Sequence, residues 1–417
     1  MCGRGLPRMR RVRPRSGRTL VPQAKPPHFL LTLFARRLDS KPLPSSHRLS
    51  IMTRLRSLVV LAALALTVSA CDSSGEDGLL AGAEANLGQW TWIDVAGSQC
   101  RDGSSTGIGV RLQDGATDLA IYLEGGGACF NGATCATNPK TFGEAEFNAR
   151  AAAVGNNGLF STAASNPVGD YNMVYVPYCT GDLHGGSFPN SSLLGEEIGV
   201  QQFVGHQNVQ RAVALLADEL DTPGKVLLTG SSAGGFGTLL NFGEVADAFT
   251  GSDLYLVDDS GPVFFQDNVF SPQLASSVTA LYNLPATLPT APQLFQTDGL
   301  PGIYAYYAST YPNATFGLSS YLGDDVIQQF FGFGQAPGDP ITDDEYAAGL
   351  RDVRSQIPSD WGTYFAAGGE HTFLLVPNRY AGTSAGVAYD AWLAGILDGS
   401  PTNVDPAVAV RAPLAAR

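Results

Sequence analysis

Short runs of apolar residues, each stopped by glycine or by polar residues, recur along the middle of the chain. Continuous apolar runs of this length are typical of strands buried on both faces, as in a parallel sheet. We expect strands at 119–123, 171–177, 226–228 and 254–257, and later ones at 314–321 and 362–366. Residues 90–93 and 107–112 instead alternate apolar and polar positions, which predicts half-buried antiparallel strands.

Helical periodicity appears between these strands. Residues 206–220 repeat apolar side chains at a spacing of three or four and end in Thr-Pro-Gly. An apolar helical stretch follows the strand at 226–228, and residues 385–397 predict a closing helix. Strands that alternate with helices predict an α/β fold with a mostly parallel sheet flanked by helices. Its ligands are expected at the carboxyl ends of the strands.

One long segment breaks this alternation. Residues 270–312 are rich in Leu, Pro and Tyr, and we interpret them as a cap over the pocket, with an ordinary surface excursion as the alternative. The pattern predicts one catalytic domain over 89–400 and a flexible tail over 401–417.

The first 70 residues are not predicted to belong to the fold. Residues 1–51 are Arg-rich and have the character of a mis-assigned start upstream of Met52, with a genuine leader extension as the alternative. Residues 52–70 combine a basic start with an apolar core too short to span a bilayer, which is typical of a signal peptide. Cys71 ends a segment that resembles the bacterial lipobox, although an ordinary signal peptide with an incidental cysteine stays open. Residues 71–88 then predict a polar tether.

This N-terminal segment predicts an exported protein. We expect a cell-envelope lipoprotein anchored at Cys71, or a secreted protein if that cysteine is not lipidated. The lipid anchor would be the protein's one contact with a membrane.

The segment also changes the charge of the chain. The full sequence has 25 Lys+Arg and 38 Asp+Glu, but 14 of the basic residues and one acidic residue, Asp39, lie in residues 1–70. The remaining chain has 11 basic and 37 acidic residues, a net charge of −26. Such a body repels nucleic acid and anionic membrane surfaces, so neither is an expected partner.

Four cysteines lie within the predicted domain. An even set in an exported chain predicts two disulfides rather than a metal site. A zinc site would need paired Cys-x-x-Cys spacing or neighbouring histidines, and the sequence has neither. We expect no metal and no cofactor. The four are Cys100, Cys129, Cys135 and Cys179.

The strand at 226–228 runs into Gly-Ser-Ser-Ala-Gly at 230–234, a Gly-x-Ser-x-Gly motif. A buried strand, a tight glycine turn and a helix together lift a serine hydroxyl above the edge of a sheet. The motif alone is weak, but this context favours Ser232 as a nucleophile.

A serine hydroxyl becomes a good nucleophile when a base takes its proton, and histidine is the usual base. Beyond residue 70 the chain has His184, His206 and His371, and only His371 follows Ser232. It lies in a glycine-rich loop after the strand at 362–366, where the chain order Ser, acid, His of α/β-hydrolases would put it.

The acid that orients this histidine is less well determined. Asp324 and Asp325 follow the strand at 314–321, and Asp258 and Asp259 follow the strand at 254–257. We favour Asp324, because the acid commonly leaves a strand late in the sheet. Asp325 and Asp259 stay open as alternatives, and Asp259 could instead bond the turn backbone that follows it.

An oxyanion needs hydrogen-bond donors in place before charge develops. The Glu-Gly-Gly-Gly-Ala segment at 124–128 resembles the glycine loop of lipases and esterases, so Gly126, Gly127 or Ala128 could donate backbone N–H groups. The N–H of Ala233, next to the nucleophile, would add another. A simple glycine turn is the alternative.

These motifs occur together in an order that resembles the pectin acetylesterase family, which includes the Notum-like serine carboxylesterases. They are Leu-Glu-Gly-Gly-Gly-Ala-Cys at 123–129, Tyr-Val-Pro-Tyr-Cys-Thr-Gly-Asp at 175–182, Gly-Ser-Ser-Ala-Gly-Gly at 230–235, Asp-Ser-Gly at 259–261 and the His371 loop.

The resemblance implies an α/β-hydrolase fold that cleaves carboxylic esters without a metal. It assigns the nucleophile to Ser232, the base to His371, the acid to the 323–326 segment with Asp324 the better match, and the oxyanion donors to the 126–128 loop and Ala233. It also implies the disulfide pairs Cys129–Cys135 and Cys100–Cys179.

Two features depart from that family. Many relatives have tryptophan where this chain has Ala128, so the acyl pocket is expected to differ in size. The acidic body also fits de-esterified pectin poorly. We therefore predict a serine ester hydrolase acting through an acyl-enzyme on an acetylated polysaccharide or another ester. A lipase, polyester depolymerase or lipid deacylase with the same triad is the first alternative, and a catalytically silent glycan-binding surface lipoprotein is the second.

Overall fold

The computed structural model describes residues 78–332 and 341–406. All of them belong to one compact unit, Asp72–Arg417. The predicted leader, signal peptide and lipidated Cys71 lie outside the described residues, as does the chain after 406. These assignments therefore stay predictions.

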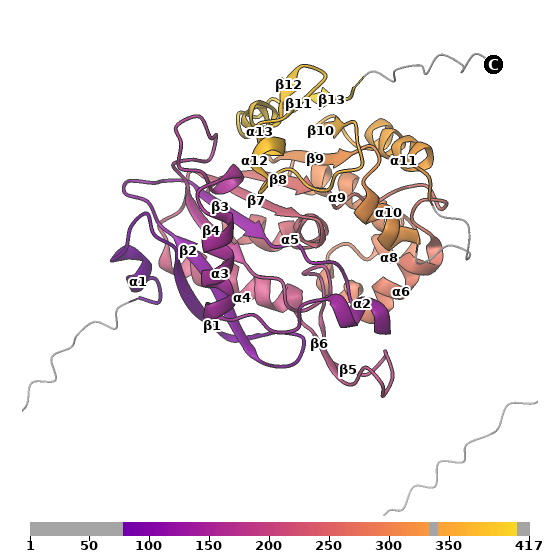
Figure 1. The fold of residues 1–417 in the computed structure, drawn as a ribbon, viewed down its shortest axis with the longest axis horizontal. Helices are drawn as coiled ribbons and strands as arrows, with labels where there is room; N and C mark the ends of the chain where they lie inside the picture. Colours follow the sequence, from indigo (N-terminus) through magenta and orange to yellow (C-terminus); the bar gives the residue numbers. More distant parts are fainter. Residues whose placement is uncertain (1–77, 333–340, 407–417) are drawn as a thin grey trace, which may run out of the picture. The chain divides into compact units, whose positions relative to one another are not determined.

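A nine-stranded sheet forms the centre of the described unit, in the order β1-β2-β4-β3-β7-β8-β9-β10-β13 (Figure 1). β1 pairs antiparallel with β2, and β2 pairs antiparallel with β4. Every other pairing in this sheet is parallel. Its strands are β1 (Thr91–Gln99), β2 (Ser105–Arg111), β3 (Leu119–Leu123), β4 (Asn172–Val176), β7 (Lys225–Ser231), β8 (Asp253–Asp259), β9 (Thr315–Tyr321), β10 (Trp361–Ala366) and β13 (Asn403–Val404).

Two small hairpins and a set of helices complete the unit. The hairpin strands are β5 (Phe188–Ser191) with β6 (Gln201–Phe203), and β11 (Thr383–Ser384) with β12 (Val387–Ala388). The α-helices are α1 (Ala81–Glu84), α2 (Gly132–Thr137), α3 (Glu144–Val154), α4 (Gly205–Glu219), α5 (Ala233–Ala248), α6 (Pro272–Tyr282), α7 (Leu284–Thr287), α8 (Gln293–Gln296), α9 (Ile303–Thr310), α10 (Asp325–Gly332), α11 (Asp343–Gln356), α12 (Pro377–Tyr380) and α13 (Tyr389–Leu397). The 3-10 turns are η1 (Gly158–Phe160) and η2 (Leu300–Gly302).

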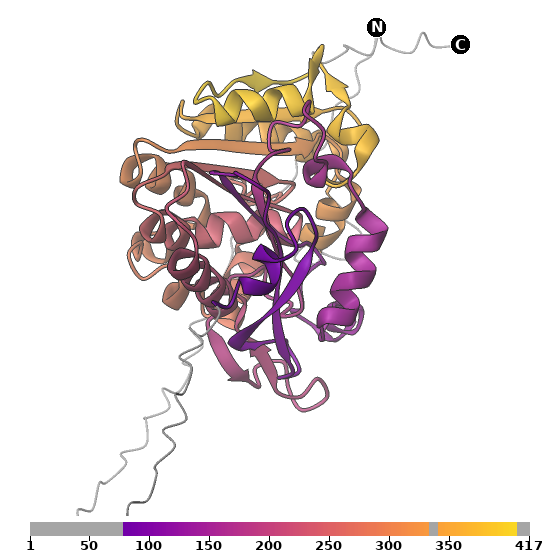
Figure 2. The same ribbon diagram turned by 90° about the vertical axis from the view of Figure 1, so that its left-hand side faces the viewer.

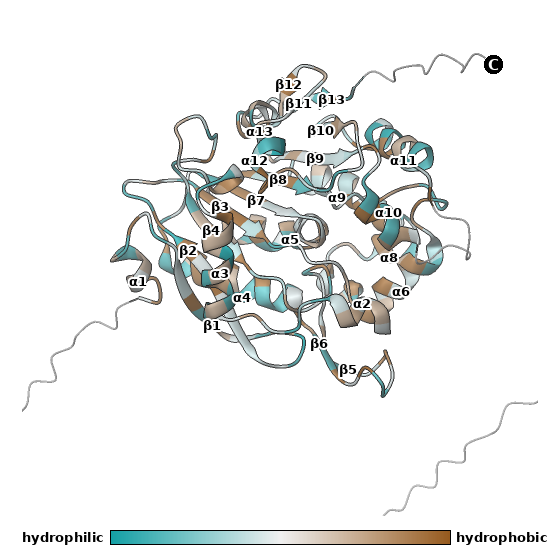
Figure 3. Cartoon of the chain, in the orientation of Figure 1, coloured by the Kyte–Doolittle hydropathy of each residue, from teal (hydrophilic) through white to brown (hydrophobic). Residues whose placement is uncertain are grey.

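Alternate side chains of the sheet supply two separate cores. In β3, Ile121 packs with the core that includes α4, α5 and α9, whereas Tyr122 packs with the core that includes α3 and α13. Figure 2 shows α3 against the opposite face of the sheet from the α4 side. β3 is covered on both faces and apolar along its length, which explains its unbroken run in the sequence and its brown colour in Figure 3.

The carboxyl ends of neighbouring strands stop in register. Leu123 pairs with Gly230, Ser231 with Asp259, and Ala366 with Tyr321. The residues that follow these ends therefore gather along one edge of the sheet, where ligands bind in open α/β folds.

The predicted strands are present, and all but β1, which ends six residues later than predicted, match to within a few residues. Three other boundaries differ. Leu80 and Ala83 are fully buried, so the packed domain begins within the predicted 71–88 tether. Asn403–Val404 forms β13 and pairs with β10, so the predicted flexible tail includes an ordered strand. Residues 385–388 belong to the β11–β12 hairpin, and the closing helix begins at Tyr389.

The predicted cap folds as helices packed on the rest of the unit. Residues 270–312 form α6 to α9, and Leu274, Val278 and Ile303 are buried. No helix in the described ranges is both long and apolar enough to cross a membrane.

Candidate active site

Ser232 lies on the sharp turn between β7 and α5. Its backbone has φ 59° and ψ −119°, a left-handed conformation that a residue other than glycine adopts only when its surroundings enforce it. A Cβ at Gly234 would collide with the carbonyl oxygen of Leu123, and one at Gly230 would collide with that of Gly234. The two motif glycines are needed because the turn packs directly on β3 and on itself. The serine thus stands at the carboxyl edge of the sheet, as predicted.

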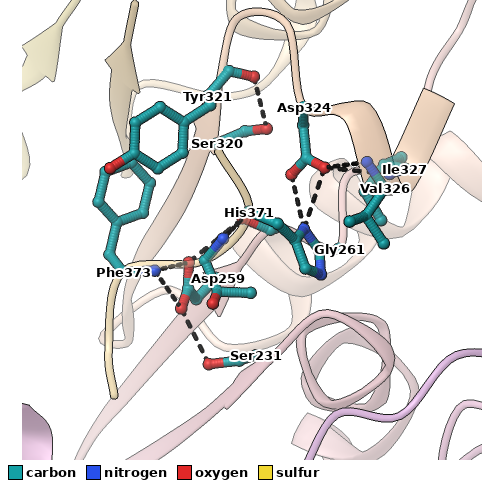
Figure 4. Close-up of polar contacts among 12 residues, drawn as sticks. Ser231, Asp259, Gly261, Ser320, Tyr321, Asp324, Val326, Ile327, His371 and Phe373 are labelled. Carbon is teal, nitrogen blue, oxygen red and sulfur yellow. Dashed lines mark hydrogen bonds and ion pairs between the residues drawn. The ribbon is translucent and has the colours of Figure 1, made fainter. Parts of the chain in front are cut away.

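The side chains of His371 and Asp324 are hydrogen-bonded at the same edge. The Nδ1 atom of His371 lies 2.8 Å from Oδ2 and 3.0 Å from Oδ1 of Asp324 (Figure 4). Asp324 is fully buried, whereas His371 is partly exposed and lines a pocket with Ser232. With Nδ1 held by the carboxylate, Nε2 is the nitrogen free to exchange a proton with a substrate or the serine.

The position of Asp324 at the start of α10 fixes its carboxylate. Its Oδ1 accepts the backbone N–H groups of Val326, at 3.1 Å, and Ile327, at 3.0 Å. This is the geometry of a helix N-cap, in which the side chain satisfies otherwise unpaired donors of the first turn. The same side chain therefore caps α10 and orients the imidazole.

The alternative acids have other contacts. Asp325 is exposed, and no contact between its side chain and His371 is found in the described residues. Asp259 accepts the backbone N–H groups of Phe373 and Leu374 rather than the imidazole. The turn contact expected of Asp259 belongs to Asp258, which accepts the N–H of Gly261 at 2.7 Å. Burial raises the pKa of the Asp258 carboxyl well above its ordinary value.

The glycine loop after β3 has two of its carbonyl groups fixed by side chains. Asn138 Nδ2 donates to the carbonyl of Gly126 at 2.7 Å, and the Tyr178 hydroxyl donates to that of Gly127 at 2.8 Å. In a trans peptide the N–H points opposite to the carbonyl. The N–H groups of Gly127 and Ala128 are therefore turned away from these partners, and no acceptor for either is found among residues 78–332 and 341–406. This orientation suits an oxyanion hole.

Replacing Asn138 with alanine is expected to lower kcat about tenfold with little change in KM. The substitution frees the Gly126 carbonyl, so the N–H of Gly127 loses its fixed direction. This effect should be smaller than the loss of an oxyanion donor, which lowers kcat on the order of 10² to 10³-fold. Steady-state kinetics on an activated ester would measure it.

Thr137→Ala is the matched control, because the Thr137 hydroxyl bonds only within α2. A rise in KM with unchanged kcat in the Asn138 variant would contradict the role assigned to this contact.

Both predicted disulfides are present and brace this loop. Cys129–Cys135 closes the chain just after it, and Cys100–Cys179 fixes the segment that carries Tyr178. The N–H of Cys129 also donates to the carbonyl of Gly181, at 2.7 Å. The conformation of the loop thus depends on contacts far apart in sequence.

A large apolar pocket opens on one side of Ser232. Its empty volume is about 800 Å³, which includes space open to solvent, so it is not an enclosed cavity of that size. The cap supplies one wall and α10 another. Its apolar lining includes Phe236, Leu240, Leu274, Val278, Ile303 and Phe331.

A second pocket lies on the other side of Ser232 and contains His371. Its lining is more polar and includes Glu124, Arg150 and Thr372. The Arg150 guanidinium lies 2.8 Å from Oε1 of Glu124, and the arginine side chain is half exposed. Burial raises the pKa of the Glu124 carboxyl, while Arg150 opposes that shift. Ser232 and Gly127 line both pockets, so they stand at the boundary between an apolar and a polar space.

The other two histidines of the described residues, His184 and His206, are buried. His184 Nε2 lies 2.8 Å from the carbonyl oxygen of Glu124, and burial lowers the pKa of its imidazole to about 4. His206 Nδ1 lies 2.8 Å from the side-chain oxygen of Asn241.

Three supporting residues were missed by sequence reasoning. The side chains of Asn138 and Tyr178 bond the oxyanion loop, and that of Arg379 bonds the His371 loop. Each of these contacts joins segments that local sequence patterns do not connect. Tyr178 lies within a family motif, which was the one available signal for it.

The family model for pectinacetylesterase matches residues 83–293. The chain belongs to the pectinacetylesterase family. The match includes Ser232 and the glycine loop but ends before Asp324 and His371. The assignment of acid and base therefore rests on the geometry described above.

The curated relatives are palmitoleoyl-protein carboxylesterases. The chain is 34% identical to notum1 of Xenopus laevis over 178 residues, which is 40% of this chain and 35% of that protein. It is 32% identical to notum1a of Danio rerio over 178 residues, which is 40% of this chain and 34% of that protein. The matches thus span about a third of the length of these relatives.

A solved structure shares the fold. The Wnt deacylase Notum from Drosophila aligns with a TM-score of 0.57 over 76% of this chain and 96% of that chain, at 19% identity. This likeness confirms the predicted α/β-hydrolase fold.

Proposed function

We propose that the protein is a serine carboxylic ester hydrolase that works through an acyl-enzyme. The observation that carries the proposal is the His371–Asp324 pair, in which Nδ1 is held at 2.8 Å and the histidine lines the same pocket as Ser232. The nucleophile turn and the two oriented N–H groups support the same chemistry.

The proposed reaction has two halves. His371 takes the proton of the Ser232 hydroxyl while the serine oxygen bonds to the ester carbonyl carbon, and the N–H groups of Gly127, Ala128 and Ala233 stabilise the resulting oxyanion. The intermediate then collapses, the bond to the alcohol oxygen breaks, and His371 returns its proton to that oxygen. Water, activated by His371 in the same way, releases the acid and regenerates the serine.

The two pockets suggest how an ester would lie. The leaving oxygen must meet His371, so the alcohol part of the substrate belongs in the polar pocket with Glu124 and Arg150. The acyl part then points into the apolar pocket under the cap. The almost entirely apolar lining of this pocket favours an acyl chain longer than acetate. The description of the relatives as palmitoleoyl-protein carboxylesterases supports the same direction.

A series of p-nitrophenyl esters from acetate to palmitate tests the proposal. We expect kcat/KM to rise with acyl length beyond acetate, since burial of each CH₂ contributes about 0.8 kcal/mol. Leu300→Trp, at the partly exposed rim of the apolar pocket, should then lower activity on long chains about tenfold and spare acetate. Leu193→Trp is the control, because Leu193 is exposed and does not line that pocket. Absence of turnover from the folded protein on every ester would overturn the proposal in favour of a silent binding scaffold.

Deacetylation of a polysaccharide is the second candidate. The family description and the polar alcohol-side pocket favour it. Acetate as the best acyl group, with no gain from longer chains, would select this candidate over the long-chain one.

We also propose that the protein acts outside the cytoplasm. The two disulfides are compatible with an oxidising compartment. The lipid anchor at Cys71 stays a prediction, which mass spectrometry of the mature N-terminus in a membrane extract would test.

A further inference from the structure

Asp259 connects the nucleophile turn to the histidine loop. It is the last residue of β8, paired with Ser231 of β7, and its main-chain carbonyl accepts the N–H of Ser232 at 2.7 Å. Its side chain is fully buried and points toward the loop that follows β10 (Figure 4). One residue therefore bonds the backbone of the proposed nucleophile and the loop that carries the proposed base.

The carboxylate binds the backbone of the His371 loop. It accepts the N–H of Phe373 at 2.9 and 3.0 Å and the N–H of Leu374 at 3.0 Å. The hydroxyl of Ser231 donates to it at 2.9 Å. An ionised carboxylate offers about four lone-pair sites and no donor, so it suits this ring of donors. Burial raises the pKa of Asp259, and the N–H groups of Leu374 and Phe373 oppose that rise.

The other side of the loop is held by Arg379. Its guanidinium donates to the carbonyl of His371 and, at 3.2 Å, to the carbonyl of Thr372. Thr372 has φ 64°, a left-handed conformation that costs free energy and persists only where surrounding contacts enforce it. Two charged side chains thus hold the N–H and carbonyl groups of a segment that has no regular secondary structure.

We infer that Asp259 is a positioning residue that sets the location of the His371 loop relative to Ser232, with Arg379 as its counterpart on the carbonyl side. This inference rests on the proposed function, because it assigns a task to His371. Asp324 orients the imidazole ring, whereas Asp259 places the backbone that carries it.

Asp259→Asn is the first test, and Asp258→Asn is its matched control. An amide offers a single acceptor oxygen and turns its NH₂ group toward other donors, so the loop loses part of its anchor. Because a displacement of about 1 Å in a catalytic group can lower the rate about 100-fold, we expect kcat to fall by about that factor, with KM little changed. Asp258 is equally buried on the same strand, but among the described residues its carboxylate bonds only Gly261, so its variant should keep kcat within a fewfold of the wild type. Equal kcat losses in the two variants would overturn the inference.

The His371→Ala background separates positioning from a general structural effect. If Asp259 acts through His371, then Asp259→Asn should not lower the residual activity of the His371→Ala variant further. A second 100-fold loss in that background would show that Asp259 acts on the nucleophile instead, and the inference would fail.

Hydrogen exchange by mass spectrometry provides a readout that needs no activity. The amides of Phe373 and Leu374 should exchange at least tenfold faster in Asp259→Asn and stay slow in Asp258→Asn. If the Asp259 variant does not fold, Arg379→Gln is the replacement test, because it leaves the buried carboxylate intact. It should lower kcat about tenfold and speed amide exchange in the same loop. Unchanged exchange in these variants would overturn the inference. A wild-type protein inactive on every ester would refute the proposed function, while the exchange result would still decide whether Asp259 anchors the loop.

Discussion

Replacing Ser232 with alanine is expected to abolish ester hydrolysis while leaving the fold intact. Removing the nucleophile of a serine hydrolase lowers kcat on the order of 10⁶-fold, because the remaining groups cannot form the acyl-enzyme. The hydroxyl carries no capping hydrogen bond for α5, so the fold loses little with it. Steady-state rates on the preferred p-nitrophenyl ester, together with the thermal midpoint, would measure both effects.

Ser231 is the matched control for this experiment. It is the neighbouring serine in the same motif and also lines the His371 pocket, but its hydroxyl donates to Asp259 at 2.9 Å. Ser231→Ala should lower the free energy of unfolding by roughly 1 to 3 kcal/mol, because a hydrogen bond to a charged group is lost, and keep activity within about tenfold. Retained turnover in Ser232→Ala, or an equal loss in both variants, would contradict the assignment of Ser232.

The sequence was sufficient for features that depend on short stretches of chain. Ser232 could be predicted because a buried strand, two glycines and an apolar helix are adjacent in sequence, and together they impose the turn. The parallel strands could be predicted because burial on both faces leaves an unbroken apolar run, as in β3. His371 followed from elimination among three histidines.

Features built from distant contacts could not be predicted. Nothing near Asn138 shows that its amide would reach Gly126, and nothing near Asp259 shows that its carboxylate would bind Phe373, 114 residues away. The different roles of the adjacent Asp258 and Asp259 could not be predicted either. Successive residues of a strand point to opposite faces, and the sequence does not show what lies on each face. Asp258 therefore turns toward Gly261, whereas Asp259 turns toward the histidine loop.

The ends of the domain were misjudged for a related reason. The polar run ends at residue 77, and residues 78–88 contain three Leu and three Ala; among them Leu80 and Ala83 fill space in the core. At the other end, Asp405 binds Arg351 at 3.0 Å and Arg354 at 2.6 Å, which holds β13 against the sheet. Two buried side chains or one ion-pair cluster are enough to order a short terminal segment. So few contacts leave no periodic pattern of apolar residues in the sequence from which the segment could be predicted.

Asp324→Asn is expected to lower kcat about 10⁴-fold without unfolding α10. Asparagine is as good an N-cap as aspartate, and its oxygen can keep the bonds to Val326 and Ile327. Its NH₂ group then takes the place of Oδ2, 2.8 Å from the imidazole Nδ1. An NH₂ donor forces the imidazole proton onto Nε2, the wrong tautomer for accepting the proton of Ser232.

Asp325→Asn isolates this tautomer effect from the helix itself. Asp325 is the first residue of α10 and exposed, so its variant changes the charge at the helix start by the same amount without touching the imidazole. We expect its kcat to stay within a fewfold of the wild type and its thermal midpoint to shift slightly. If Asp325→Asn lost as much activity as Asp324→Asn, helix charge rather than histidine orientation would explain both. A loss confined to Asp324, at an unchanged thermal midpoint, would identify a single carboxylate that both begins a helix and sets the tautomer of the base.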